Sequence, residues 1–120
     1  MTFNKAVFKC LKNYGNFDGR ASRSEYWWFF LFTHIIIFTV KIIVYSCSNI
    51  DVETQWFLGV LPVAILVTPL LAVGSRRLHD TGKSGWLQIM ALIVLGGIIL
   101  SILYCRKSDE GKNKYGILDD

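Results

Sequence analysis

Three long apolar runs dominate the pattern of hydrophobic and polar positions along this chain. They cover residues 26–45, 56–73 and 86–104, and each begins with Trp or Tyr. At a rise of ~1.5 Å per residue, each run is about 27–30 Å long as a helix, which matches the thickness of a bilayer core. Aromatic residues at the ends of such runs are typical of the lipid headgroup level. The pattern therefore predicts three transmembrane helices.

The segment before the first run has the periodicity of an amphipathic helix. At ~100° per residue, apolar and aromatic residues share one face and lysines share the opposite face. The first face holds Phe3, Val7, Cys10 and Tyr14, and the second holds Lys5, Lys9 and Lys12. This pattern predicts a short helix over residues 2–14 that lies in the membrane interface, with its lysines toward anionic lipid. The alternative is a helix packed on another segment of the protein.

A signal for the start of a helix stands directly before the first apolar run. Ser22 and Glu25 have the S-x-x-E spacing of a capping box, in which the hydroxyl accepts a hydrogen bond from a backbone N–H of the first turn. We therefore expect the first spanning helix to begin at Arg23, with Ser22 as its N-cap.

Composition places the chain among membrane proteins. It is 52% hydrophobic with a mean hydropathy of +0.40, and its charged fraction of 18% lies below the roughly 25% of soluble domains. We predict an all-α integral membrane protein of one domain, with a polar tail over 105–120. The cysteines at 10, 47 and 105 form no C-x-x-C pair, so we expect no metal and no cofactor. We expect lipid as a partner, and no nucleic acid.

The basic residues predict the orientation of the chain. Residues 1–25 hold five Lys or Arg and the loop 74–85 holds three, whereas the loop 46–55 holds none. Positive residues favour the cytoplasmic side, so we expect a cytoplasmic N-terminus. With three spans, the basic tail faces outside, where Cys105 could share an oxidising compartment with Cys47 and form a disulfide. If Gly96-Gly97 instead broke the third run into a re-entrant hairpin, the tail would return to the cytoplasm.

Three motifs resemble a known family. The stretches are "FDGRASRSEYWWF", "PLLAVGSRRLHDTGKSGW" and "GKNKYG", in this order along the chain. They resemble the bacterial inner-membrane family called domain of unknown function 805. The resemblance implies a small multi-span protein of the bacterial inner membrane, and it implies no activity, substrate or catalytic residue. One departure lies at the end, where family members often have a proline after the motif and this chain reads "YGILDD".

The predicted cytoplasmic loops carry the candidate site. Guanidinium groups bind phosphate in a bidentate way, so these loops predict a site for lipid headgroups or an acidic ligand. The candidate ligand residues are Arg20, Arg23, Arg76, Arg77, His79 and Lys83. The alternative is a structural network of ion pairs and caps that fixes the helices, to which Ser22, Glu25, Asp80 and Ser84 would belong.

Catalytic interpretations of these loops are weaker. Gly82-Lys83-Ser84 lacks the first glycine of a P-loop, because position 77 is Arg77, and no strand precedes it. Asp18-Gly19 and Arg23 match part of a phospho-alcohol transferase motif, but the further acidic metal ligands are missing. Neighbouring residues on a helix do not face each other, so His79 and Asp80 are a poor acid–base pair. We expect Asp80 to close the turn and His79 to meet solvent or lipid phosphate.

One ionisable residue lies inside a predicted span. His34 is about 12 Å deep in the first run, where Thr68 of the second run or a backbone carbonyl could bond to it. We therefore predict a non-enzymatic membrane module that docks lipid, an acidic ligand or a partner protein at its inner face. A small oligomeric carrier or channel that uses His34 is the alternative.

Overall fold

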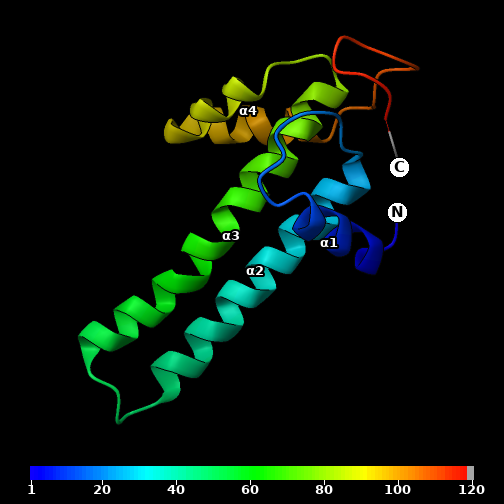
Figure 1. Cartoon of the computed structure of the whole chain (residues 1–120). Helices are drawn as coiled ribbons and strands as arrows, with labels where there is room; N and C mark the ends of the chain where they lie inside the picture. Colours follow the sequence, from blue (N-terminus) through cyan, green and yellow to red (C-terminus); the bar gives the residue numbers. More distant parts are fainter. Residues whose placement is uncertain (119–120) are drawn as a thin grey trace.

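A computed structural model describes residues 1–118, apart from the side chains of residues 92 and 94. This part of the chain is all-α (Figure 1). Its elements are α1 (Phe3–Lys12), α2 (Arg23–Ser46), α3 (Val52–Asp80), the 3-10 helix η1 (Gly85–Leu92) and α4 (Val94–Tyr104). The all-α class that the sequence predicts is therefore confirmed.

The two longest helices, α2 and α3, form an antiparallel hairpin (Figure 1). They contain the predicted spans 26–45 and 56–73, and both are long and apolar enough to cross a bilayer. Large apolar side chains such as Phe38, Ile42 and Phe57 are more than half exposed along the hairpin. An apolar surface of this kind is stable in lipid rather than in water.

The start of α2 confirms the prediction from the capping signal. Ser22 has an extended backbone, and its hydroxyl accepts a hydrogen bond from the backbone N–H of Glu25 at 3.2 Å. The helix therefore begins at Arg23. The Glu25 carboxylate, which in a capping box would turn back to the N-cap, instead lies 2.8 Å from a guanidinium nitrogen of Arg76.

The prediction of one continuous helix over 86–104 is wrong. The run divides at Ile93, whose backbone is extended, into η1 and α4. The physical reason is close packing at glycines, which a hydropathy pattern does not reveal. A Cβ at Gly96 would overlap the Met90 carbonyl, and a Cβ at Gly74 would overlap the side chain of Gln88. These glycines let α4 fold back on η1, and η1 approach α3.

The divided segment does not have the length of a span. With 11 residues, α4 is about 16 Å long, roughly half of a bilayer core. Figure 1 shows η1 and α4 side by side as an arm that leaves the hairpin sideways near the end of α3. The structure therefore has two candidate spans and a short apolar arm, close to the re-entrant alternative of the sequence analysis.

The arm returns the tail to the end of the molecule where the chain begins. The backbone N–H of Asp109 donates to the Asp80 carbonyl at 2.9 Å, and Arg23 donates to the Cys105 carbonyl at 3.3 Å. Cys47 caps the other end of α2, which is 24 residues or about 36 Å long. A disulfide requires Cα atoms within about 7 Å, so the bond between Cys47 and Cys105 is excluded.

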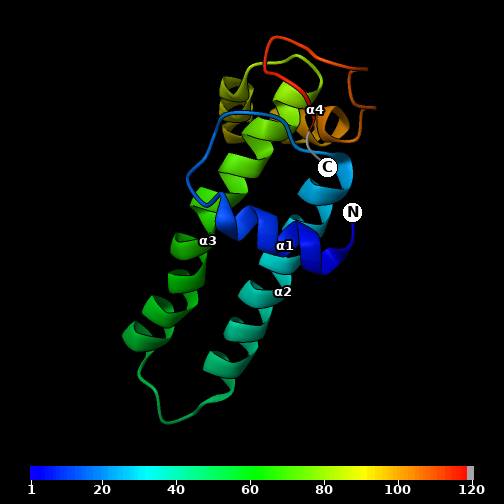
Figure 2. The same cartoon turned by 45° about the vertical axis from the view of Figure 1, so that its right-hand side comes forward.

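Helix α1 lies across α2 (Figure 2). The predicted helix of residues 2–14 is shorter, from Phe3 to Lys12, with Thr2 as N-cap. The ring of Phe3 packs edge-on against Trp28 with centroids 5.7 Å apart, and Cys10 is fully buried. Part of the apolar face therefore packs on another segment of the protein, as the alternative interpretation of this helix predicted. Its place at the membrane interface stays a prediction.

The glycine contacts of the arm give a matched pair of variants. Gly96→Ala should lower the free energy of unfolding by about 1–3 kcal/mol, because its Cβ would overlap a backbone carbonyl that cannot move freely. Nothing lies within 4 Å of a Cβ at Gly97. Gly97→Ala should therefore be neutral or stabilise by up to ~1 kcal/mol, since alanine favours the helix. Thermal unfolding in detergent measures both, and equal melting temperatures would contradict the packing.

Cysteine labelling tests which segments share a side of the membrane. We expect a membrane-impermeant maleimide to label Cys47 in intact spheroplasts and to reach Cys105 only after permeabilisation. Cys10 should stay unlabelled in both, because burial, with the nearby Glu25 carboxylate, raises the pKa of its thiol to about 12. Labelling of both Cys47 and Cys105 in intact cells would mean that the arm crosses the membrane.

Candidate functional site

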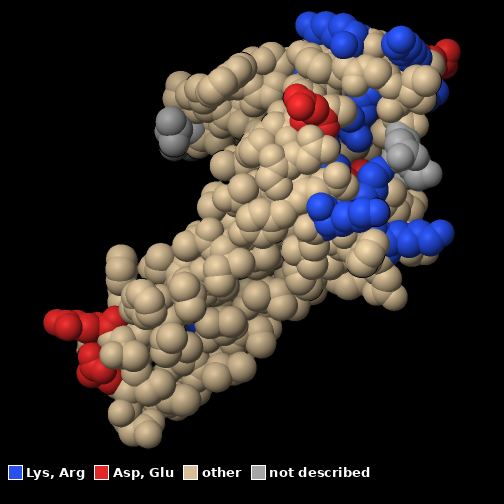
Figure 3. Space-filling model, viewed as in Figure 1, with Lys and Arg blue, Asp and Glu red and all other residues tan. Residues whose placement is uncertain are grey.

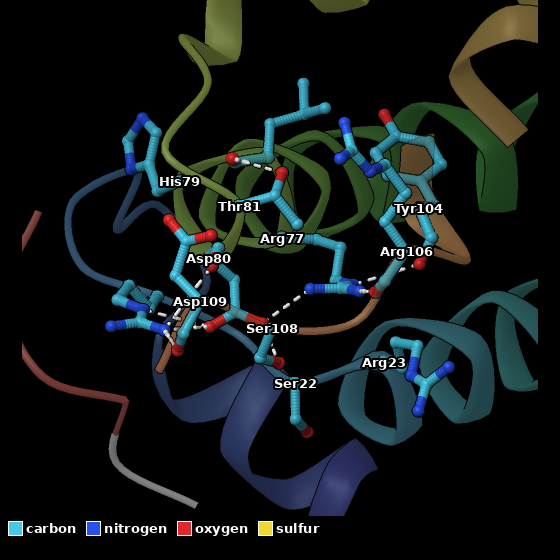
Figure 4. Close-up of polar contacts among 12 residues, drawn as sticks. Ser22, Arg23, Arg77, His79, Asp80, Thr81, Tyr104, Arg106, Ser108 and Asp109 are labelled. Atoms are coloured by element: carbon cyan, nitrogen blue, oxygen red, sulfur yellow. Dashed lines mark hydrogen bonds and ion pairs between the residues drawn. The ribbon is translucent and has the colours of Figure 1, made fainter. Parts of the chain in front are cut away.

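Asp80 joins two buried arginines at the end of α3. Its Oδ1 lies 2.8 Å from Arg20 Nη2 and its Oδ2 lies 2.5 Å from Arg77 Nη1, and none of the three side chains is exposed. The Ser108 hydroxyl donates to the same carboxylate from the tail (Figure 4). We call these four residues the Asp80 cluster. It combines the segment before α2, the end of α3 and the tail.

The remaining guanidinium hydrogens of the Asp80 cluster go to backbone carbonyls. Arg20 donates to the carbonyls of Asp109 at 2.8 Å and Gly111 at 2.6 Å. Arg77 donates to the Tyr104 carbonyl at 3.0 Å and also to that of Arg106. Because an arginine has five N–H donors in a fixed plane, these contacts occupy most of what each side chain can offer. The two arginines thus hold the tail and are not exposed to a headgroup.

A second buried cluster surrounds Glu25 under α1. Arg76 Nη1 lies 2.8 Å from Glu25 Oε1, and Lys9 Nζ lies 3.3 Å from Glu25 Oε2. The Cys10 thiol donates to Oε1 at 3.7 Å. Among the described atoms, Nε and Nη2 of Arg76 are buried without a hydrogen-bond partner. This Glu25 cluster fixes α1 and α3 to the start of α2.

The other predicted ligand residues lie apart from these clusters. Arg23 is exposed and points away from Asp80 in Figure 4. His79 does not meet solvent as expected: its Nδ1 lies 2.9 Å from the Gly19 carbonyl, and its ring stacks on Tyr115 with centroids 3.8 Å apart. Lys83 is half-buried in the turn after α3. Ser84 is the N-cap of η1.

The expectation that Asp80 closes the turn after α3 is also wrong. The carboxylate points into its cluster, and the Thr81 hydroxyl bonds to the Leu78 carbonyl at 3.1 Å instead. In the membrane part, His34 Nδ1 lies 2.9 Å from the Phe30 carbonyl of its own helix. Thr68 is not the partner of this nitrogen and is half-buried in α3.

The sequence brought the tail to the same face as the two arginines only under the re-entrant alternative, and it predicted no contact between them. The available signal was the motif "GKNKYG", which holds two residues whose side chains contact His79. Asn113 Nδ2 donates to the His79 carbonyl at 2.8 Å, and Tyr115 stacks on the His79 ring. The contribution of Ser108 and of the tail carbonyls had no signal, because carbonyl acceptors are present at every residue.

A groove of about 820 Å³ lies next to the Asp80 cluster, between α3, η1, the segment before α2 and the tail. It is lined by Phe17, Asp18, Leu71, Ser75, His79, Ser84, Gly85, Trp86, Gln88, Ile89 and Tyr115. No cluster of His, Cys, Asp and Glu that could hold a metal ion occurs among the residues that the structure describes.

Comparison with known proteins shows a family and two inner membrane proteins to which the chain is similar. Residues 14–117 match the family model described as "Protein of unknown function (DUF805)". The inner membrane protein YhaI of Escherichia coli K12 is 36% identical over 107 residues, which cover 88% of this chain and 87% of that protein. The inner membrane protein YhaH of the same strain is 34% identical over 109 residues, 90% of each chain. No solved structure matches.

Neutralising Asp80 should destabilise the fold strongly. Asp80→Asn keeps the size of the side chain but leaves two buried guanidinium groups without a counter-charge, and breaking a buried pair in this way costs about 3–5 kcal/mol. Glu110→Gln, on an exposed residue of the tail, is the control and should melt like the wild type. Thermal unfolding in detergent measures both. If Asp80→Asn has the same melting temperature as the control, the cluster does not hold the tail.

Proposed function

This chain belongs to the DUF805 family, and we propose that it is a non-enzymatic inner-membrane module whose basic end binds anionic lipid headgroups at the cytoplasmic face. The family and the two Escherichia coli relatives bear out the resemblance noted from the motifs. The proposal concerns what the module does there, and it rests on the distribution of charge.

The observation that carries the proposal is the separation of charge along the molecule (Figure 3). Apart from Lys41, every Lys and Arg belongs to the segments at the end of the molecule where α1, the end of α3 and the tail up to residue 118 lie. The opposite turn carries Asp51 and Glu53. Because short basic segments stay on the cytoplasmic side, this distribution favours an inner location for both termini and the tail.

Burial divides the basic residues into two groups. Arg20, Arg76 and Arg77 are at most 4% exposed and have internal partners, which favours a structural role for them. The exposed group consists of Lys5, Lys12, Arg23, Arg106, Lys107, Lys112 and Lys114. Each basic residue near an anionic leaflet contributes about 1 kcal/mol to lipid attraction. The exposed group is therefore the stronger candidate for headgroup contact.

The two groups are connected through the tail. The Asp80 cluster and its carbonyl contacts hold residues 104–116, and this stretch carries four of the basic residues of the exposed group. The buried arginines thus contribute indirectly, because they fix a basic segment beside the start of α2. A flexible tail would lose more conformational entropy on binding.

The alternative function, a small carrier or channel, gains no specific support. It relies on His34, whose Nδ1 is bonded to a carbonyl within α2 and whose ring lies 4.1 Å from that of Phe30. Such contacts are those of a structural histidine. We therefore base the proposal on the basic end alone.

Charge reversal in the tail tests the proposal. Lys107→Glu with Lys112→Glu should lower the preference for anionic over zwitterionic lipid by on the order of tenfold or more, since each reversal removes an attraction of about 1 kcal/mol and adds a repulsion. Native mass spectrometry of protein from mixed phosphatidylglycerol and phosphatidylcholine nanodiscs measures the lipids retained.

The matched control for this experiment is Lys41→Glu. Lys41 lies near the other end of α2, five residues before Ser46, and should leave the retention of anionic lipid unchanged. An unchanged preference in the double tail variant, or an equal loss in the control, would contradict the proposal.

A further inference from the structure

The residues that line the groove beside the Asp80 cluster lie at successive depths, from the basic end of the molecule toward the apolar hairpin. On α3, Leu71, Ser75 and His79 are spaced by four residues and so share one face of the helix. From His79 to Leu71 this face extends about 12 Å along the helix axis. The groove thus begins at the basic end of the molecule and continues toward the apolar part of the hairpin.

The second wall, η1, runs in the opposite direction to α3. Gly85 lies against Ser75, since a Cβ at Gly85 would overlap the Ser75 hydroxyl. Gln88 lies beside Leu71, to whose carbonyl its Nε2 donates at 3.0 Å. The chain therefore moves deeper as it passes from Gly85 to Ile89. Ile89 is 58% exposed, so this wall is open to the side.

The polarity of the lining changes with this depth. The deep part holds Leu71 and Ile89, and the amide of Gln88 is already bonded to the Leu71 carbonyl and the Tyr104 hydroxyl. The outer part holds Asp18, His79, Ser84 and Tyr115. An apolar deep part and a polar outer part, arranged along the axis of a candidate span, match a molecule with one hydrocarbon chain and a polar head.

The charge of the lining differs from that of the surrounding surface. The lining contains the Asp18 carboxylate and no Lys or Arg, although the nearby tail and turn are basic. A headgroup that carries only negative charge would be repelled by the Asp18 carboxylate, and the lining offers no cation to attract it. A head with an ammonium group can donate to Asp18, and the hydroxyls of Ser84 and Tyr115 can donate to its phosphate.

From these observations we propose that the groove binds one phospholipid with an ammonium-bearing headgroup, which enters from the bilayer. One acyl chain lies between Leu71 and Ile89, and the head lies at Asp18 and Ser84. The volume of about 820 Å³ falls within the range of roughly 300–1,000 Å³ that is usual for sites of small molecules. The site is distinct from the exposed basic group, and it does not depend on the function proposed above.

The test uses the full chain, reconstituted with equal amounts of phosphatidylethanolamine and phosphatidylglycerol and then released into mild detergent. We expect native mass spectrometry to find one retained phosphatidylethanolamine per chain. Leu71→Trp should fill the groove and reduce the retained fraction at least tenfold. Leu95→Trp, on an exposed residue of α4 outside the lining, is the control and should retain the lipid like the wild type.

Two further variants keep the test decisive. If Leu71→Trp unfolds, Ile89→Trp fills the groove from the opposite wall and takes its place. Asp18→Asn should keep the bound lipid but abolish the preference for phosphatidylethanolamine. The Lys107→Glu with Lys112→Glu variant should retain this lipid, so loss of the basic-face effect and loss of the groove lipid can be told apart.

Four results would overturn the proposal. They are the absence of a single retained phosphatidylethanolamine, an equal loss in Leu95→Trp, a loss of phosphatidylglycerol rather than phosphatidylethanolamine in Leu71→Trp, and the retention of a second protein chain in place of lipid.

Discussion

The carboxylate of Asp80 is the interaction on which the arrangement of both chain ends depends. Moving a charge from water into a protein interior costs several kcal/mol per ion even after relaxation, on the order of the stability of a whole domain. Arg20 and Arg77 are both buried, so one carboxylate has to offset two such penalties with the help of backbone carbonyls. Those carbonyls come from the tail and from Tyr104 at the end of α4, so the contacts require the tail to lie beside the end of α3.

The division of the third apolar run follows from the same requirement. Arg77 bonds to the Tyr104 carbonyl, which places the end of α4 next to the end of α3. A continuous helix over 86–104 would carry Tyr104 about 27 Å away from the loop at Gly85. The chain instead reverses at Ile93, where Gly96 lets α4 pack on the Met90 carbonyl. Ion pairing and close glycine packing therefore support one topology.

The sequence predicted the features that depend on local chemistry. Ser22 caps α2 as its spacing with Glu25 indicated, and the first two apolar runs form the hairpin. It offered a break at Gly96-Gly97 only as an alternative and could not choose it over a continuous span, because hydropathy is the same for a spanning helix and for a packed apolar hairpin. It left open whether Arg20 and Arg77 bind a headgroup or join a structural ion-pair network, since phosphate and internal acceptors are both good partners for a guanidinium group. The role of the tail motif is evident only from the contacts of Asn113 and Tyr115 with His79 in the structure.

The sideways arm also gives the protein an asymmetric outline. The α2–α3 hairpin alone has two helices in cross-section, whereas the end that carries η1, α4 and α1 is wider (Figures 1 and 2). Embedded in a bilayer, such a body displaces more lipid area in one leaflet than in the other. Lipids around the narrow end must spread to fill the difference, and the stress is relieved where the membrane bends toward that end. We therefore expect a body of this outline, embedded with its wide end in one leaflet, to be sensitive to local curvature without any dedicated residue.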